Sequence, residues 1–337
     1  MKKSDEILNE IKKRIYGKDP TILMILTSII AGGHVLIEDV PGVGKTTMAL
    51  AFSKAMGLDY GRVQFTPDVL PSDITGFTIY DKETATMKYQ EGAIFHNLFL
   101  ADKLNRASSR TQSALLEAME EGQTTVDGKT YKLPEPFIVF ATQNPSGAAG
   151  TSLLPDSQMD RFTIKISMGY PSIKSEMAMI TAKNLEKSGE AGDTKVVQQV
   201  CSAKDLKDMQ TEAGSIFVSD VMIEYIVKLI YATRENPLID RGASPRATIA
   251  LTEMAKAHAY VKGKDFVTPE DVQAVFFPTI AHRILISSEA DIQGVKVEDL
   301  LKNIWIAASA IGMSEKGNEY NHQVSASIDA ICAVTNI

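Results

Sequence analysis

A lysine and a threonine follow a glycine-containing turn in the segment VPGVGKTT, residues 40–47. Residues 34–38 before this turn, with the apolar run Val35-Leu36-Ile37, predict a buried strand, and the residues after the turn have the spacing of a helix. Such a turn presents backbone N–H groups and a favourable helix dipole to an anion. We predict that it holds phosphate, with the Lys45 ammonium on the terminal phosphates and the Thr46 hydroxyl on magnesium. The predicted cradle comprises Pro41, Gly42, Val43, Gly44, Lys45, Thr46 and Thr47.

One position departs from the strict phosphate-loop pattern. The pattern GxxxxGK[ST] places a glycine at residue 39, where this chain has Asp39. Gly42 and Gly44, which let the backbone approach the phosphates, are present. Because strand, turn, lysine–threonine pair and helix occur together, we predict a phosphate site in spite of this substitution.

An acid follows a second predicted buried strand. In NLFLADKLNR, residues 97–106, the apolar run ends at Asp102. Magnesium prefers hard oxygen ligands and keeps several waters, so one carboxylate beside the phosphate loop suffices to hold it. A second acid is expected next as the base that activates water, and this chain has Lys103 there. The segment therefore leaves three possibilities open: a nucleotide hydrolase without its base, a nucleotide-binding switch, and a chance resemblance.

Further polar residues follow in an order that suits a nucleotide site. A third predicted strand, within residues 137–145, ends in Gln143 and Asn144, where a side-chain amide can orient a water against a γ-phosphate. Arg161 comes next along the chain, and Arg246 stands far downstream, just inside a predicted helix start. We expect both guanidinium groups to contact phosphate.

The first half of the chain must position these residues. Residues 1–170 alternate predicted strands and helices, which is typical of a parallel α/β sheet with helices on both faces. Within this part, residues 75–92 and 122–133 predict two β-hairpin insertions, and the second contains the turn Asp127-Gly128.

The remaining chain has a different pattern. Residues 171–314 show helical spacing and predict a smaller all-helical domain, with Ser219 and Thr268 as helix N-caps. Residues 315–337 match no interpretable pattern, and we expect them to be frayed or disordered.

Charge and hydropathy narrow the classes of function. The formal net charge of −7 argues against a protein that binds nucleic acid or an anionic membrane. The longest apolar stretch, residues 21–37, is slightly short for a membrane span and is interrupted by Gly32 and Gly33. The two cysteines and five histidines show no metal-ligand spacing. We expect a cytoplasmic protein with no nucleic acid partner and no stable membrane insertion.

The order of these motifs along the chain resembles that of an AAA+ ATPase, and the amino-acid sequences of the motifs closely resemble those of the MoxR family. The likeness spans roughly residues 5 to 285 and is highly specific, because several of its strings occur together in few other settings. Beyond the phosphate loop it is carried by QFTPDVLPSDITG (64–76), EGAIFHNLFLAD (91–102), NRASSRTQSALLEAMEE (105–121), FATQNP (140–145), LPDSQMDRF (154–162), GASPRA (242–247) and VTPEDVQAV (267–275).

The resemblance implies a role for each nucleotide-site residue of the first strands. Lys45 and Thr46 would be the phosphate and magnesium residues, and Asp102 would be the Walker B metal carboxylate. Family members place a glutamate at the position of Lys103. The segment Ile15-Tyr16-Gly17 matches the adenine-contacting segment of the family.

The resemblance also assigns the later residues. Asn144 is similar to sensor 1, Arg246 to sensor 2, and Arg161 to the arginine finger that a neighbouring subunit inserts. The family's cofactors are ATP or ADP with Mg²⁺. Its members form homo-oligomeric rings, so a hexamer is expected.

The implied function is a machine that couples ATP binding and hydrolysis to the remodelling or maturation of protein partners. The family is associated with von Willebrand factor A-domain proteins, which are therefore expected partners. The alternative is a nucleotide-gated assembly scaffold that binds ATP but scarcely hydrolyses it. A DNA-directed AAA+ protein is disfavoured by the acidic charge and by the absence of a basic recognition helix.

Overall fold

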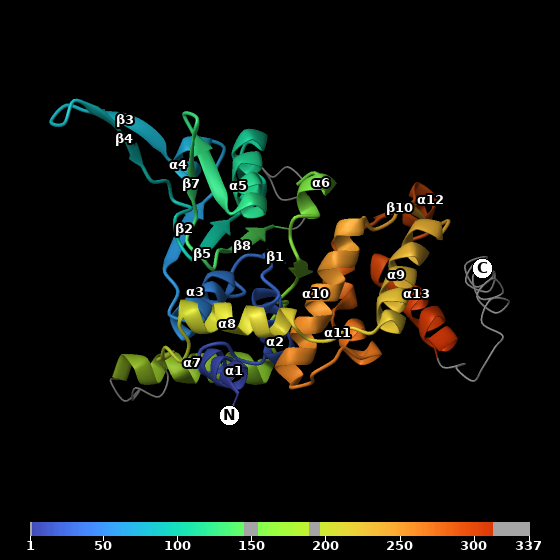
Figure 1. Cartoon of the computed structure of the whole chain (residues 1–337). Coiled ribbons are helices and arrows are strands. Elements are labelled where there is room, and N and C mark those ends of the chain that lie inside the picture. The colour runs from blue at the N-terminus through green and yellow to red at the C-terminus, as the bar shows by residue number, and fades with distance from the viewer. Residues whose placement is uncertain (1, 145–153, 189–195, 313–337) are drawn as a thin grey trace. The chain divides into compact units, whose positions relative to one another are not determined.

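The computed structural model describes residues 2–144, 154–188 and 196–312 (Figure 1). The expected disordered tail, residues 315–337, lies outside the described residues. The chain divides into two compact units, Met1–Glu212 and Ala213–Ile337. The boundary at residue 170 that the sequence predicts therefore falls inside the first unit.

The first unit extends beyond residue 170 because the following segment bonds to its core. The backbone N–H groups of Val200 and Cys201 both donate to the carbonyl oxygen of Ala55, at 2.9 and 3.1 Å. The Gln210 side chain donates to the carbonyl oxygen of Ile29 at 2.9 Å. These bonds attach the chain on either side of the start of α8, Ala203–Gly214, to the nucleotide-site half of the molecule.

A five-stranded parallel sheet is the centre of the first unit, with the strand order β2-β5-β8-β1-β9. The two strands β5 and β8 are buried along their whole length, as their unbroken apolar runs predict for strands covered on both faces. Because all strands are parallel, their carboxyl ends lie at one edge. The strands are β1 (Val35–Glu38), β2 (Tyr60–Gln64), β5 (Leu98–Asp102), β8 (Ile138–Gln143) and β9 (Ile164–Ile166).

Helices surround this sheet. The phosphate-loop helix α3 and the capped helix α5 are the two that follow strands bearing candidate site residues. The side chain of Ser108 accepts a hydrogen bond from the N–H of Thr111, and Gly122 ends α5 in the left-handed conformation. The helices are α1 (Lys3–Lys12), α2 (Asp19–Ile30), α3 (Lys45–Ala55), α4 (Pro71–Thr75), η1 (Leu104–Arg106), α5 (Ser109–Glu121), α6 (Asp156–Met159) and α7 (Ile173–Ser188).

Both predicted hairpins are confirmed. Strands β3 (Phe77–Asp81) and β4 (Thr86–Gln90) pair antiparallel and extend away from the sheet, and β6 (Gln123–Val126) pairs with β7 (Lys129–Lys132) (Figure 1). The turn residue Asp127 has a positive φ, as a tight hairpin turn demands. The ring of Tyr89 in the first hairpin stacks on that of Tyr131 in the second, with ring centres 3.7 Å apart.

The second unit is mainly helical, as predicted. The expected N-caps Ser219 and Thr268 begin α9 and α11, and Thr268 forms a capping box with Asp271. A short antiparallel pair of strands, β10 with β11, accompanies the helices. The elements are α9 (Asp220–Glu235), β10 (Ile239–Arg241), α10 (Pro245–Lys262), α11 (Pro269–Ile280), η3 (Ala281–Arg283), β11 (Leu285–Ile286), α12 (Ser288–Ile292) and α13 (Val297–Gly312).

Within the described ranges, none of the helices combines the length and the apolar character needed to cross a membrane.

Candidate functional site

The phosphate loop joins β1 to α3 in the predicted way. Gly42 and Gly44 have φ angles of +90° and +96°, a backbone conformation that other residues adopt only with strain. Gly44 is also the N-cap of α3, so the helix begins at Lys45. The first N–H groups of a helix have no partner within the helix, so those of Lys45, Thr46 and Thr47 have the orientation that suits an anion.

The ammonium group of Lys45 lies over the loop itself. It donates to the carbonyl oxygens of Asp39 at 2.5 Å and Val40 at 3.2 Å. Burial lowers the pKa of Lys45, the charges of Asp39 and Asp102 oppose this, and the charge of Lys103 adds to it. The net effect is a lowered pKa. The charges of Asp102, at the end of β5, and of Lys103, directly after it, therefore both act on Lys45.

Asp39, the departure from the strict pattern, joins the phosphate loop to the segment after β9. Its Oδ2 accepts hydrogen bonds from the N–H groups of Met168 at 2.6 Å and Gly169 at 2.7 Å, and from the Ser167 hydroxyl at 2.9 Å. Its Oδ1 accepts from the N–H of Val40 at 2.9 Å. Burial raises the pKa of Asp39, but these bonds outweigh it, so the pKa is lowered and the group is a carboxylate.

The predicted adenine-contacting segment lies beside the same connection. Lys18 donates to three successive carbonyl oxygens, those of Met168, Gly169 at 3.2 Å and Tyr170 at 2.9 Å. A Cβ atom on Gly17 would lie 2.2 Å from the Ser175 hydroxyl oxygen, so only glycine fits there. Tyr16, half-buried, precedes this contact. The segment is thus held next to the backbone that Asp39 binds.

Asp102 ends β5, and its two oxygens have different partners. Oδ1 accepts from the Thr142 hydroxyl at 2.8 Å, and Oδ2 accepts from the guanidinium of Arg62 at 2.7 Å. Burial raises the pKa of Asp102, whereas Arg62, Thr142 and Lys103 lower it, with a net lowering. Asp102 is therefore ionised, as a metal carboxylate must be. Arg62, on the neighbouring strand β2, is a site residue that the motifs did not predict.

Lys103 has an unusual backbone conformation. Its φ of 60° and ψ of 46° place it in the left-handed region, which is uncommon outside glycine. Its N–H donates to the Thr142 hydroxyl at 2.9 Å, and that hydroxyl in turn donates to Asp102. Thr142 therefore fixes the chain direction immediately after the strand, where Lys103 is the N-cap of η1.

The polar end of β8 is also buried. The Gln143 side chain donates to Glu38, which pairs with Lys165 at 3.0 Å. Asn144 is 8% exposed, and its carbonyl oxygen accepts from the Asn105 side chain at 3.2 Å. The structure thus brings Asn144 to the same sheet edge as Asp102, next to the ends of β1 and β5.

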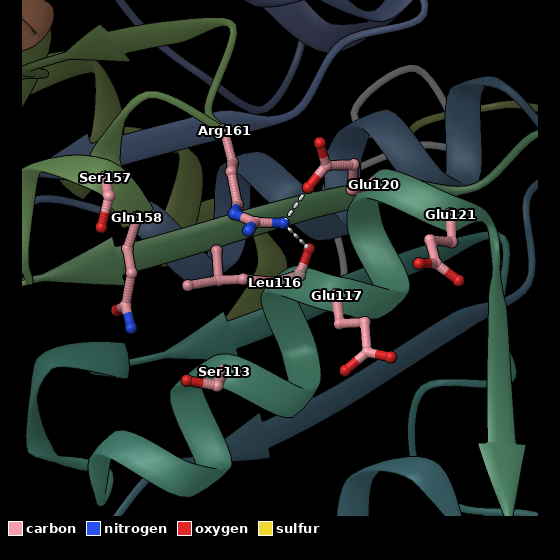
Figure 2. A pocket seen from close by; sticks show the side chains of 8 residues that line it. All are labelled: Ser113, Leu116, Glu117, Glu120, Glu121, Ser157, Gln158 and Arg161. Carbon is pink, nitrogen blue, oxygen red and sulfur yellow. Dashed lines mark hydrogen bonds and ion pairs between the residues drawn. The ribbon is translucent and has the colours of Figure 1, made fainter.

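Arg161 lies elsewhere in the first unit, in a shallow pocket of about 430 Å³ (Figure 2). Its guanidinium forms an ion pair with Glu120 and donates to the Leu116 carbonyl oxygen at 3.2 Å. Glu117 also lines this pocket (Figure 2). Neither Lys45 nor Asp102 is among the residues that line this pocket.

Arg246 belongs to the second unit. It is the second residue of α10, after the N-cap Ser244 and Pro245, and its side chain is exposed. The predicted helix start is confirmed.

Comparison with known proteins agrees with this geometry. Residues 34–164 match the family model described as the ATPase family associated with various cellular activities (AAA), and residues 231–304 match the AAA lid domain. A crystal structure of a protein from Cytophaga hutchinsonii, assigned as an ATPase, superposes with a TM-score of 0.81 at 37% identity and covers 90% of this chain and 93% of its own.

Two curated relatives are similar over most of their length. The chain is 43% identical to the uncharacterized protein YeaC of Bacillus subtilis, over 89% of this chain and 92% of the relative. It is 35% identical to the chaperone MoxR1 of Mycobacterium tuberculosis, over 88% of this chain and 79% of the relative. The chain belongs to the MoxR family of AAA+ ATPases. This MoxR chain is therefore an ATPase of the AAA+ class, with a nucleotide-binding domain followed by a lid.

The donor chemistry of the MoxR site suits the magnesium that AAA+ proteins typically use. Thr46 and Asp102 supply hard oxygen atoms, and nucleotide phosphates and water complete such a shell. Asp102 is ionised and lies at the correct strand end. The surrounding positive charge is less suitable for a cation, since Arg62 already donates a hydrogen bond to one oxygen of Asp102. Arg62 was missed because a lone arginine in a strand is usually a solvated residue.

Proposed function

We propose that this MoxR protein binds ATP or ADP at the edge formed by β1, β5 and β8 and uses the bound nucleotide to remodel or mature protein partners. Lys45 and the N–H groups of Gly42 to Thr47 bind the phosphates, and Thr46 and Asp102 hold magnesium when it is bound. The observation that carries the proposal is the phosphate loop itself, with Gly42 and Gly44 at positive φ and Lys45 beginning α3.

Thermal stabilisation by nucleotide tests this binding site. At a nucleotide concentration 100 times Kd, a ligand that binds only the folded chain stabilises it by about 2.7 kcal/mol. Lys45→Ala should abolish this stabilisation, because the ammonium is the cation that reaches the β- and γ-phosphates. Lys54→Ala, on the exposed side of the same helix, serves as the matched control and should retain it. An unchanged stabilisation in Lys45→Ala contradicts the assignment.

We further propose that hydrolysis is slow because Lys103 stands where a base is needed. A charged lysine accepts no proton, and Lys103 adds positive charge beside Lys45 and Asp102. Glu117 and Glu120, on the helix that follows Lys103, are the alternative carboxylates for the base, and both line the Arg161 pocket (Figure 2). Slow turnover with tight binding favours a second function, a nucleotide-gated scaffold whose assembly depends on binding alone. Steady-state phosphate release distinguishes the two.

The assembly that we propose is a homo-oligomeric ring, expected to be a hexamer, with von Willebrand factor A-domain proteins among its partners. An arginine finger acts on the nucleotide of a neighbouring subunit, which requires a head-to-tail arrangement that closes. For Arg161 to take this role it must leave Glu120, so the ion pair is the contact that assembly would replace.

Light scattering with and without an ATP analogue tests the ring. Arg161→Ala should leave nucleotide binding nearly unchanged and depress hydrolysis, because the guanidinium acts on the neighbour's phosphates. Glu120→Gln, which weakens the pairing, should not depress hydrolysis. A chain that stays monomeric with nucleotide at high concentration contradicts ring assembly.

By the resemblance, Asn144 and Arg246 take the sensor roles, and Tyr16 with Gly17 contacts the adenine.

A further inference from the structure

Three cationic side chains surround the carboxylate at the end of β5. The guanidinium of Arg62 donates to Asp102 Oδ2 at 2.7 Å. Lys45 and Lys103 both act electrostatically on their neighbours here, since Asp102 raises the pKa of Lys45 and Lys103 lowers the pKa of both Lys45 and Asp102. The guanidinium thus bonds the carboxylate directly, and the two ammonium groups act on this strand end through their charges.

A hydrogen bond to the Lys103 backbone holds this residue at the end of β5. This observation does not depend on the charges of the side chains. The Thr142 hydroxyl bridges the Lys103 N–H, at 2.9 Å, and Asp102 Oδ1, at 2.8 Å. Thr142 is 1% exposed, so this bridge is buried. The residue that replaces the usual acid therefore lies at the strand end where the base of an ordinary site would lie.

The charge balance of this edge differs from that of an ordinary phosphate-loop site. There, one lysine and a doubly charged magnesium face two carboxylates, the metal ligand and the base, and leave one net positive charge for the phosphates. Here Lys45, Arg62 and Lys103 face Asp102 and Asp39, which also leaves one net positive charge, without any metal. Glu38 does not enter this balance because it pairs with Lys165.

Magnesium would be less favourable here than in an ordinary site. To bind Asp102 Oδ2 it must displace or share the guanidinium of Arg62, and its two charges would add to those of two nearby ammonium groups. Magnesium also gives up its own water reluctantly. The Arg62 side chain is 41% exposed and that of Asp102 is 11% exposed. Arg62 can therefore donate to a phosphate from the guanidinium nitrogens that do not bond Asp102, while its bond to the carboxylate is kept.

We propose that this site binds nucleoside di- and triphosphates with little dependence on a divalent cation, because Arg62 and Lys103 supply the positive charge that magnesium supplies elsewhere. This inference rests on the proposed nucleotide binding at Lys45 and Thr46. The recognised chemistry is the polyphosphate, bound by two ammonium groups, one guanidinium and the N–H groups at the start of α3.

The test is a pair of titrations of the full chain with ADP and with ATP by calorimetry, one with excess magnesium and one with excess EDTA. We expect Kd to differ between the two conditions by less than about tenfold, which is about 1.4 kcal/mol. A larger loss of affinity in EDTA overturns the inference and leaves the proposed nucleotide site standing. The absence of binding in both conditions overturns the proposed nucleotide site and this inference with it.

Variants sharpen the same measurement. The double variant Arg62→Gln, Lys103→Glu restores the charge balance of an ordinary site, so its affinity should fall by more than tenfold when magnesium is replaced with EDTA. Lys54→Gln removes one positive charge from the exposed side of α3 and is the matched control. It should behave as the unmodified chain does. A double variant that stays insensitive to EDTA assigns the metal independence to some other feature and overturns the roles of Arg62 and Lys103.

Discussion

The phosphate loop after β1 and the strand end of β5 each depart from the usual motif by one residue, and the fold treats the two departures differently. At the phosphate loop, Asp39 replaces a glycine and receives hydrogen bonds from three backbone N–H groups and one hydroxyl. At β5, Lys103 replaces an acid, and its backbone, rather than its ammonium group, is what the Thr142 hydroxyl holds.

This difference shows that the effect of a substitution in a motif depends on the function of the substituted position. Residue 39 lies in the loop between β1 and α3, where an acid gains local hydrogen-bond partners and its negative charge offsets part of the positive charge around Lys45. Residue 103 is a position that handles a proton, and a lysine there changes the sign of the charge beside Lys45. The fold accommodates Asp39 through new hydrogen bonds, whereas Lys103 changes the chemistry of the site.

The largest effect is expected from Lys103→Glu, which repairs the chemical departure. Restoring a general base should raise the turnover of ATP by about 10²- to 10⁴-fold, since this is the usual contribution of such a group. Steady-state phosphate release at a protein concentration that supports assembly measures it. Lys103→Gln is the matched control, because it removes the charge without adding a base, and it should not reach the rate of the glutamate variant. Equal ordinary rates for Lys103→Glu and the unmodified chain would mean that the base lies elsewhere.

Asp39→Gly restores the strict phosphate-loop pattern and should nevertheless harm the protein. It leaves the N–H groups of Met168 and Gly169 without their carboxylate partner, and the loss of such charge-assisted bonds is expected to cost about 3 kcal/mol of the free energy of unfolding. Denaturant unfolding measures it. Asp39→Glu keeps the charge and should lose less. An Asp39→Gly protein as stable as the unmodified chain would show that the carboxylate is incidental.

A smaller effect is expected at the hydroxyl that orders the end of β5. Thr142→Val keeps the shape but leaves the Lys103 N–H and one oxygen of Asp102 without their shared partner, at a cost of about 1–3 kcal/mol in the free energy of unfolding. Thr142→Ser retains the hydroxyl and should recover most of this loss. If the serine and valine variants have equal stability, the bridge contributes nothing.

The smallest effect is the acid dependence contributed by Asp39. Its pKa in the folded chain is lowered from the ordinary value of 3.8, because the bonds from Gly169, Ser167, Val40 and Met168 outweigh burial. A lowered folded pKa gives stability that is full above the unfolded value and is lost as pH falls through the folded value. The stability advantage of the unmodified chain over Asp39→Asn should therefore shrink below about pH 4. An advantage that does not change with acid would contradict this origin.

Local signals in the sequence predicted much of this structure. The phosphate loop, the acid at the end of β5, the two hairpins and the helix starts at Ser219 and Thr268 each depend on neighbouring residues, so they could be recognised from short segments. The domain boundary could not, because it depends on bonds such as that from Gln210 to Ile29, far apart in the chain.

Other contacts of the site could not be predicted for the same reason, since they join segments that are far apart in the chain. Arg62 reaches Asp102 only because β2 and β5 are neighbours in the sheet, in a register that pairs Gln64 with Asp102. Three of the partners of Asp39 lie in the segment directly after β9, the strand that flanks the other side of β1. Similarly, the pairing of Arg161 with Glu120 joins two segments that no short motif connects. Each requires knowledge of strand order, which motifs do not contain.

The stacked rings of Tyr89 and Tyr131 make the two hairpins behave as one lever rather than two separate arms. We expect a load applied at the tip of the β3–β4 hairpin to act on the β6–β7 hairpin through the stacked rings. The only residue between β6 and α5 is Gly122, so the load reaches the last turn of that helix. That turn carries Glu120, the partner of Arg161. We therefore expect a displacement at the outermost part of the chain to affect the ion pair between Glu120 and Arg161.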